Sequence, residues 1–361
     1  MKLTKFFSLL LACAALVVGC DNGDTPGEDK PTGNITLTAD AESVDLGTPI
    51  TFTVMCEGVD VTSASKIYLR AGEFPEVSNP YTPESDGVYE FYAVYGASVS
   101  SRISVTVLPV VPALPKDAEP ANTSFNHRIL LVDHTGVQCS YCPQMMQALK
   151  DVSETGDYHS KYYEAMSHTY NTSDPAWSKA ADAVTANYPT GGSYPSLTYN
   201  FRHNHVSKQD ATDIMQQIDA LWSADGAAAG IAASSCVASS SVIVNVEVKA
   251  AEAADYRITA WLLEDAIEAA QGGAKEDWMN IHNNAIRQIV ASDDISGVAL
   301  GAIEAGATAS AVLDLPILSQ KWNRENFKVM LIVSKPNSAG RYDVANVAIC
   351  PANGTLTYDY K

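Results

Sequence analysis

The stretch Arg128–Gln147, "RILLVDHTGVQCSYCPQMMQ", places a cysteine pair between the pattern of a buried strand and the start of an amphipathic helix. Its first part is a short, nearly continuous apolar run, which is typical of a strand covered on both faces. After the cysteines, Met145, Leu149 and Val152 recur at the spacing of one helical face. A C-x-x-C pair in this position has three interpretations: a disulfide-exchange site, half of a metal site, or a structural staple.

The position of the pair favours disulfide exchange. At a helix N-terminus, unpaired N–H groups and the helix dipole stabilise a thiolate, so we expect Cys139 to lie there as the attacking nucleophile. Cys142 is then the second thiol, which resolves the mixed disulfide.

A metal site has less support, because tetrahedral zinc usually takes a second pair of Cys or His ligands and the chain has no second C-x-x-C. His134, His168 and the two histidines of "RHNH", His203 and His205, are the remaining candidates. Histidines in such polar runs are more often hydrogen-bonded or at the surface. We therefore expect neither a metal nor a cofactor.

The first twenty residues, "MKLTKFFSLLLACAALVVGC", read as an export signal, with two lysines before a short apolar run. "VVGC" resembles a bacterial lipoprotein box, which predicts a signal peptide over 1–19 and acyl chains such as palmitate on Cys20. The polar segment 20–33 then serves as a flexible tether to the membrane. The alternatives are a competing box at Cys13 and an ordinary secretory signal with a free Cys20.

Charge excludes one class of partner. The chain carries 23 Lys and Arg against 42 Asp and Glu, a formal net charge of −19. A polyanion of this size has no electrostatic reason to bind nucleic acid.

Composition divides the mature chain into an all-β segment (34–108), a Pro-rich linker (109–122), a segment of mixed periodicity (123–228) and a second all-β segment (229–361). Short alternating strands predict antiparallel sandwiches in both all-β segments, and the first resembles immunoglobulin-like modules. Within the second, "EDWMNIHNNAIRQIV" is predicted to be a loop or a short helix. The protein is thus predicted to be multidomain.

The mixed segment alternates strands and helices, which predicts an α/β domain. "YYEAMSH" and "YPSLTYN" have strand patterns. A helix is expected in "SDPAWSKAADAVTANY" with Asp174 as its N-cap, and another in "SKQDATDIMQQIDALW", opened by a capping box of Ser207 and Asp210.

Three further cysteines remain in an exported chain, where pairing is the default. Cys56 shares a strand face with Phe52 and Val54, so we expect a buried free thiol. Cys236 and Cys350 lie in strand-like runs and are a candidate structural disulfide, although sequence alone does not fix connectivity.

The segment 123–228 resembles the thioredoxin superfamily through "LLVDHTGVQCSYC" and "GGSYPSLTYN". The resemblance implies that Asp133, six residues before Cys139, is buried beneath the disulfide and moves the proton of Cys142. It also implies a cis bond at Tyr194–Pro195, with both residues shaping the substrate groove. Gln138 and the Ser140–Tyr141 dipeptide depart from the common thioredoxin pattern, and leave the redox potential open.

A narrower resemblance rests on "TGVQCSYCP", "WLLEDAIEAAQGG" and "IHNNAIRQIV". These motifs are similar to the outer-membrane protein twenty-eight-related lipoproteins of Bacteroidota. That family implies a thioredoxin-like domain (123–228) joined to a C-terminal β-domain (229–361) at the outer membrane, here with an added N-terminal module.

Two functions follow from the sequence. The first is a membrane-anchored thiol-disulfide oxidoreductase that acts on protein thiols or disulfides through Cys139 and Cys142. The second is a non-enzymatic surface lipoprotein that binds or adheres to a cell-surface ligand, with the cysteine pair as a structural disulfide. The side of the membrane, periplasm or cell surface, stays open.

Overall fold

The structure is a computed structural model that describes residues 31–188, 192–201, 203–204 and 208–361. The predicted signal peptide, Cys20 and most of the tether lie outside these residues, as do Ser207, His205 and the side chain of His203. Strands dominate the described chain, and its α-helices are α1 Cys142–Glu154, α2 Lys179–Asn187 and α3 Ala211–Leu221. None of its helices has the length and apolar character needed to span a membrane.

The chain divides into two compact units. The first contains the described residues up to Asp40, with Thr51–Pro80 and Glu90–Ile103. The second contains Ala41–Ile50, Tyr81–Tyr89 and all of Ser104–Lys361.

The N-terminal region is all β, with two sheets in the orders β1-β3-β4 and β2-β9-β7-β5-β6, and β8 paired to β7. Its strands are β1 Ile35–Ala39, β2 Ser43–Asp45, β3 Phe52–Cys56, β4 Val59–Asp60, β5 Lys66–Leu69, β6 Glu76–Val77, β7 Gly87–Tyr95, β8 Ser98–Val99 and β9 Ile103–Leu108. Phe52, Val54 and Cys56 are buried on one face of β3, and the ring of Phe52 lies 4.7 Å from that of Phe91 on β7. The prediction of a buried free thiol at Cys56 is confirmed.

The second unit contains a nine-stranded sheet in the order β13-β12-β10-β11-β19-β16-β22-β23, with β20 also paired to β16. A four-stranded sheet has the order β21-β15-β14-β24, and β17 pairs with β18. The strands of the large sheet are β10 Ile129–Thr135, β11 Tyr162–His168, β12 Ser196–Tyr199, β13 His203–Asn204, β16 Ala254–Glu264, β19 Ala285–Ile289, β20 Val298–Ile303, β22 Phe327–Pro336 and β23 Tyr342–Pro351. The others are β14 Ala229–Val237, β15 Ser241–Ala250, β17 Ile267–Glu268, β18 Ile281–His282, β21 Thr308–Pro316 and β24 Gly354–Leu356.

This large sheet runs across the boundary that the sequence predicted between residues 228 and 229. β19, which the sequence predicted as loop or helix, is a strand that pairs in parallel with β11 on one side and antiparallel with β16 on the other. The prediction was wrong because β19 has only five residues and follows a polar run, so its strand pattern is too short to stand out.

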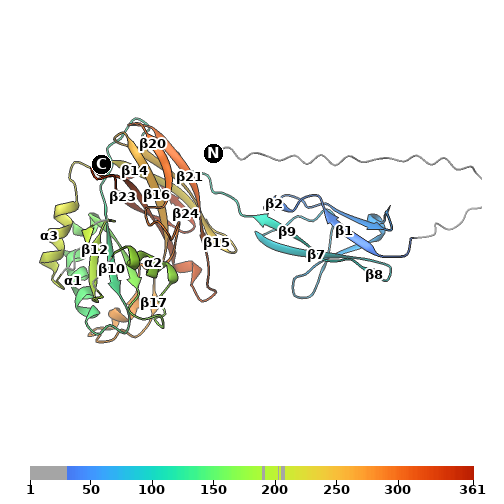
Figure 1. Ribbon diagram of the computed structural model, residues 1–361, viewed down its shortest axis with the longest axis horizontal. Coiled ribbons are helices and arrows are strands. Elements are labelled where there is room, and N and C mark those ends of the chain that lie inside the picture. The colour runs from blue at the N-terminus through green and yellow to red at the C-terminus, as the bar shows by residue number, and fades with distance from the viewer. Residues whose placement is uncertain (1–30, 189–191, 202, 205–207) are drawn as a thin grey trace, which may run out of the picture. The chain divides into compact units, whose positions relative to one another are not determined.

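Three apolar clusters define the layers. Alternate residues of β10, Ile129 and Leu131, pack against α1 and α3, which lie together beside β10 and β12 in Figure 1. The intervening Leu130 and Val132 pack on the opposite face with α2 and with Trp261 of β16. At β16, β22 and β23, the large sheet packs the face that α2 does not cover against the four-stranded sheet. The two sheets together form a β-sandwich.

Helix caps differ from those predicted. α2 begins at Lys179, with Ser178 as its N-cap accepting from the Ala181 N–H, so Asp174 does not cap it. Asp210 itself caps α3 and accepts from the N–H groups of Thr212 and Asp213. In both helices the side chain closest to the first turn satisfies the free N–H groups.

Cys236 and Cys350 are free, so the predicted candidate disulfide between them is wrong. Cys350, on β23, lies 3.6 Å from the hydroxyl of Ser235 on β14. Because neighbouring side chains on a strand point to opposite faces, Cys236 points away from Cys350. Its thiol instead approaches the carbonyl oxygen of Val110 in the linker.

Part of the predicted linker is held against the four-stranded sheet. Asn245 of β15 donates to the Pro112 carbonyl oxygen, and the buried Lys249 pairs with Asp117 at 2.9 Å. The hydroxyl of Tyr360 lies 3.0 Å from the Lys249 ammonium, so the linker and the C-terminal residues share one buried cation.

We expect Trp261→Ala to weaken both halves of the second unit, because this fully buried indole packs with residues from both. Truncation of a buried Trp typically lowers the free energy of unfolding by about 3–5 kcal/mol. Hydrogen–deuterium exchange should rise in peptides covering β10–β11 and in those covering β22–β23. Val312→Ala, at an exposed position of β21, is the control, and a rise confined to β22–β23 would contradict one cooperative sheet.

Candidate functional site around the Cys139–Cys142 disulfide

The cysteine pair lies in the turn that connects β10 to α1. Cys139 and Cys142 form a disulfide, with their Cα atoms 5.4 Å apart. α1 begins at Cys142 with Pro143 in its first turn, so Cys139 precedes the helix by three residues instead of starting it as predicted. Cys139 is only 2% exposed and Cys142 is fully buried.

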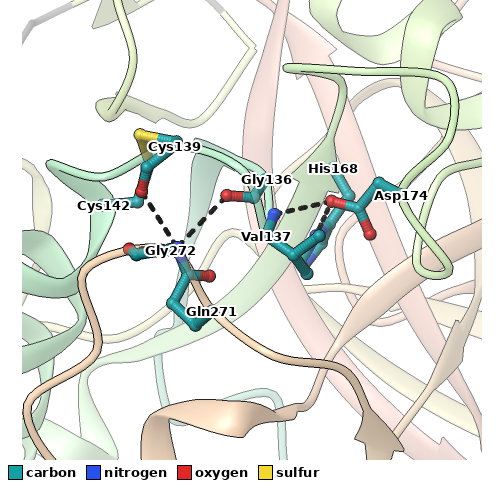
Figure 2. The surroundings of a disulfide bond; sticks show 8 residues. All are labelled: Gly136, Val137, Cys139, Cys142, His168, Asp174, Gln271 and Gly272. Carbon is teal, nitrogen blue, oxygen red and sulfur yellow. Dashed lines mark hydrogen bonds and ion pairs between the residues drawn. A yellow bond between two sulfur atoms is a disulfide. The ribbon is translucent and has the colours of Figure 1, made fainter.

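Asp174 fixes the turn before the cysteines. Its Oδ2 accepts from the Val137 N–H at 2.8 Å and from His168 Nδ1 at 2.9 Å, as Figure 2 shows, while Oδ1 accepts from the Ala176 N–H. Burial opposes ionisation of this carboxyl, yet its hydrogen bonds outweigh burial and hold the pKa of Asp174 below its ordinary value. A buried, ionised carboxylate is therefore the anchor of this turn.

A segment from the C-terminal half of the chain, Asp265–Asn284, covers the turn from the other side; we call it the arm. Gln271 Nε2 donates to the carbonyl oxygens of Cys139 at 2.9 Å and Gly136 at 3.3 Å (Figure 2). The Gly272 N–H donates to the Val137 carbonyl oxygen at 2.6 Å. The arm thus contributes to the low exposure of Cys139.

The arm is a hairpin-like excursion between β16 and β19, closed at its base. β17 pairs with β18 along its length. At the base, Asp265 Oδ1 accepts from the Asn284 N–H at 2.7 Å and Asn283 Oδ1 accepts from the Ala266 N–H at 3.0 Å. Ala266 and Asn284 both have positive φ values, 55° and 59°, so the chain turns sharply where it enters and leaves the arm.

Asp133 is fully buried on β10. Asp133 lies on the same face of β10 as Ile129 and Leu131, because side chains two residues apart on a strand point the same way. Its carboxyl therefore lies on the face of the sheet that α1 covers. Neither carboxyl oxygen has a hydrogen-bond partner among the described residues. Burial, and to a smaller extent the charge of Glu164, raise the pKa of Asp133 well above its ordinary value. Asp133 is therefore suited to hold a proton at neutral pH.

The Tyr194–Pro195 peptide bond is cis, which agrees with the sequence-based prediction. The antiparallel register pairs Ser196 with His134, so Pro195 lies at the end of β12 next to the end of β10 and its cysteine turn. The ring of Tyr194 packs edge-on against that of Tyr170, 5.5 Å away, and Tyr170 is half exposed. Tyr141, between the cysteines, is also exposed.

Two of the histidines weighed as metal ligands, His134 and His168, are engaged in hydrogen bonds. The ring nitrogens of His134 each lie 3.0 Å from a threonine hydroxyl, those of Thr185 and Thr198, and burial lowers the pKa of His134 to about 4. His168 binds Asp174 and packs edge-on against His282. Across the described residues, no three His, Cys, Asp or Glu side chains are arranged to hold a metal.

A cavity of about 1000 Å³ lies away from the cysteines, between α2 and the loop before β22. Trp177 and Trp322 line it, together with the buried ion pair of Arg287 and Glu264 at 2.6 Å. The guanidinium of Arg287 also lies 5.5 Å from the ring of Trp322. The positive charge of Arg287 is thus neutralised by Glu264 within the protein.

The sequence missed Asp174 and Gln271 as residues of the cysteine site. Asp174 was predicted as a helix cap because Pro175 follows it. Gln271 lies 132 residues from Cys139, and no local pattern marks an amide whose partners are backbone carbonyls.

We expect Gln271→Ala to expose the disulfide more often, because two hydrogen bonds between the arm and the turn are lost. A net loss of about 0.5–1.5 kcal/mol per hydrogen bond is about 1–3 kcal/mol for the two. It corresponds to roughly a fivefold to hundredfold faster reduction by dithiothreitol through local opening. Gln144→Ala, on the exposed face of α1, is the matched control. An unchanged reduction rate would mean that the arm does not limit access.

No protein-family model and no curated protein matches the chain. Among solved structures, HBP35 of Porphyromonas gingivalis is similar, with a TM-score of 0.51 at 14% sequence identity. The match covers 63% of this chain and 76% of that chain. A likeness at this identity is one of fold.

Proposed function

We propose that the protein is a thiol-disulfide oxidoreductase of the cell envelope, with Cys139 and Cys142 as its redox pair. The observation that carries the proposal is the disulfide itself, at the end of a strand that holds the buried Asp133, whose pKa is raised. A carboxyl with a raised pKa beside a cysteine pair is suited to accept and return a thiol proton near neutral pH.

Topology supports a thioredoxin-like domain around this pair. Along the chain the order is β10, α1, β11, α2, β12, β13, α3, and in the sheet it is β13-β12-β10-β11. β10 and β11 are parallel, β12 is antiparallel to β10, and α2 lies on the face opposite α1 and α3. In this domain Pro195 and Tyr194 border the groove where a substrate would lie.

The proposed exchange proceeds in two steps. In the reduced protein the Cys139 thiolate attacks one sulfur of a substrate disulfide, forming a mixed disulfide and releasing one substrate thiolate. The ionised form of Asp133 then accepts the proton of Cys142, and the Cys142 thiolate attacks Cys139 Sγ. This attack releases the second substrate thiolate and re-forms the Cys139–Cys142 bond. The substrate disulfide is reduced and the protein dithiol is oxidised, so the electrons balance.

A binding lipoprotein with a structural disulfide is the second candidate function. It is favoured by the burial of both cysteines beneath the arm and by the 1000 Å³ cavity lined by two tryptophans. Its ligand would be a cell-surface or extracellular molecule. A reduction potential below about −300 mV would favour this function over exchange.

Trapping distinguishes the two functions. We expect Cys142→Ser to accumulate mixed disulfides with protein thiols in cells, because the resolving thiol is absent, and the double variant with Cys139→Ser to accumulate none. Non-reducing gels with mass spectrometry identify these species. Cys350→Ser, a buried thiol outside the site, controls for nonspecific capture. Equal trapping in the absence of Cys139 would rule out the proposed exchange.

We also propose that acyl chains on Cys20 anchor the protein in the outer membrane, facing the periplasm or the cell surface. The lipoprotein box supports this, as does the origin of the fold neighbour HBP35 in a member of the Bacteroidota, the group of the resembled lipoproteins. The membrane-bound protein would meet its thiol or disulfide partners there.

We expect metabolic labelling with a palmitate analogue to mark the wild-type protein and to be lost in Cys20→Ser, which should also leave the membrane fraction. Cys13→Ser tests the competing box. Labelling that survives Cys20→Ser but not Cys13→Ser would move the anchor to Cys13.

A further inference from the structure

Glu164, on β11, is a partly buried residue whose carboxyl the exchange steps above do not use. Its Oε1 is buried and has no hydrogen-bond partner among the described residues. Burial raises the pKa of Glu164 to about 7, although the charge of Lys328 opposes the shift. Near neutral pH, both the protonated and the ionised form are therefore populated.

Glu164 and Asp133 are neighbours on adjacent strands. Glu164 shares a strand face with Tyr162, and Asp133 shares one with Leu131. Tyr162 and Leu131 both belong to the apolar cluster under α1. The parallel register pairs Leu131 with Glu164 and Asp133 with Met166. The two acidic residues are thus diagonal neighbours on one face, with Cα atoms roughly 8 Å apart for standard strand spacings. The charge of Glu164 contributes to the raised pKa of Asp133, so the two carboxyls interact electrostatically.

Glu164, unlike Asp133, borders a cavity. The cavity has a volume of about 440 Å³ and lies between α1, β11 and the arm, lined by Met146, Lys150, Tyr162, Glu164, Trp278 and Asn283 among others. A space of this size with several polar groups holds water. Asp133 is fully buried and does not line it, so Glu164 stands between Asp133 and the cavity.

We propose that Glu164 relays protons between Asp133 and the water of this cavity during disulfide exchange, an inference that rests on the function proposed above. When Cys142 has given its proton to Asp133, the protonated Asp133 carboxyl passes a proton to the Glu164 carboxylate. Glu164 then releases it to cavity water, and both carboxyls return to their starting forms. No electrons move in these steps.

The charged groups around Glu164 fix the sign of the pH dependence. Lys150 of α1 lines the cavity but is paired with Glu154, and Lys328 of β22 is paired with Asp265 at 2.6 Å. Among the lining residues, the arm contributes neutral ones, including Trp278 and Asn283. Glu164 accepts a proton only when ionised, so the resolving step should accelerate as the pH rises through about 7.

The test uses the reduced full-length chain and oxidised glutathione as the probe. Acid quenching and intact-mass spectrometry separate formation of the Cys139–glutathione disulfide from its resolution by Cys142. We expect Glu164→Gln to leave formation unchanged, to slow resolution about tenfold or more at pH 7.5, and to remove the inflection near pH 7. Formate, a small carboxylate that fits the cavity, should restore the rate.

Glu304→Gln, an exposed carboxyl after β20 that does not line the cavity, is the control and should resolve like the wild type. Glu164→Gln with the wild-type rate and pH profile would overturn the relay, and so would slow resolution without formate rescue, which marks a structural role. If the Gln variant loses the far-UV circular dichroism of the wild type, Glu164→Met replaces it in the same measurement. A wild type that never forms the glutathione adduct at Cys139 would refute the exchange function itself.

Discussion

The parallel pairing of β11 with β19, at Met166 and Ala285, is the constraint on which the rest of the second unit depends. The Met166 N–H donates to the Asn284 carbonyl oxygen at 2.8 Å, so the end of the arm is hydrogen-bonded to the strand next to β10. Through this contact the strands around the cysteine pair and those of the C-terminal sandwich become one sheet. The arm leaves β16 and returns into β19, and its middle therefore lies over the cysteine turn.

Two buried carboxyls, Asp174 and Asp133, and the partly buried Glu164 have different electrostatic environments. Asp174 receives hydrogen bonds from two backbone N–H groups and a histidine and stays ionised. Asp133 has none, and Glu164 has one oxygen without a partner. Burial raises the pKa of both carboxyls, and the charge of Lys328 on β22 opposes this only in part for Glu164. The surroundings of each carboxyl, and not its residue type, set its pKa. They make Asp174 an ionised anchor and suit Asp133 and Glu164 to proton exchange.

Local patterns predicted most strands, α1 and the pairing of Cys139 with Cys142, because each depends on residues close together in the chain. The cis bond before Pro195 was implied by the resemblance to thioredoxins. Features that depend on distant partners were missed. The separation of Cys236 from Cys350 follows from which face of β14 each neighbour takes, and a one-residue shift would reverse it. β19 and Gln271 acquire their roles only when β16 and β11 are brought to opposite sides of one short strand.

Gly273 lies beside the turn with a φ of 75°, and a Cβ atom there would come within 2.6 Å of the Ser140 carbonyl oxygen. Any other residue at this position meets both an unfavourable backbone conformation and a clash with main-chain atoms that cannot move aside. The close packing of the arm against the cysteine turn thus requires a residue without a side chain at position 273. During evolution, a single codon change at position 273 is enough to separate the arm from the cysteine turn, while Cys139 and Cys142 both stay intact.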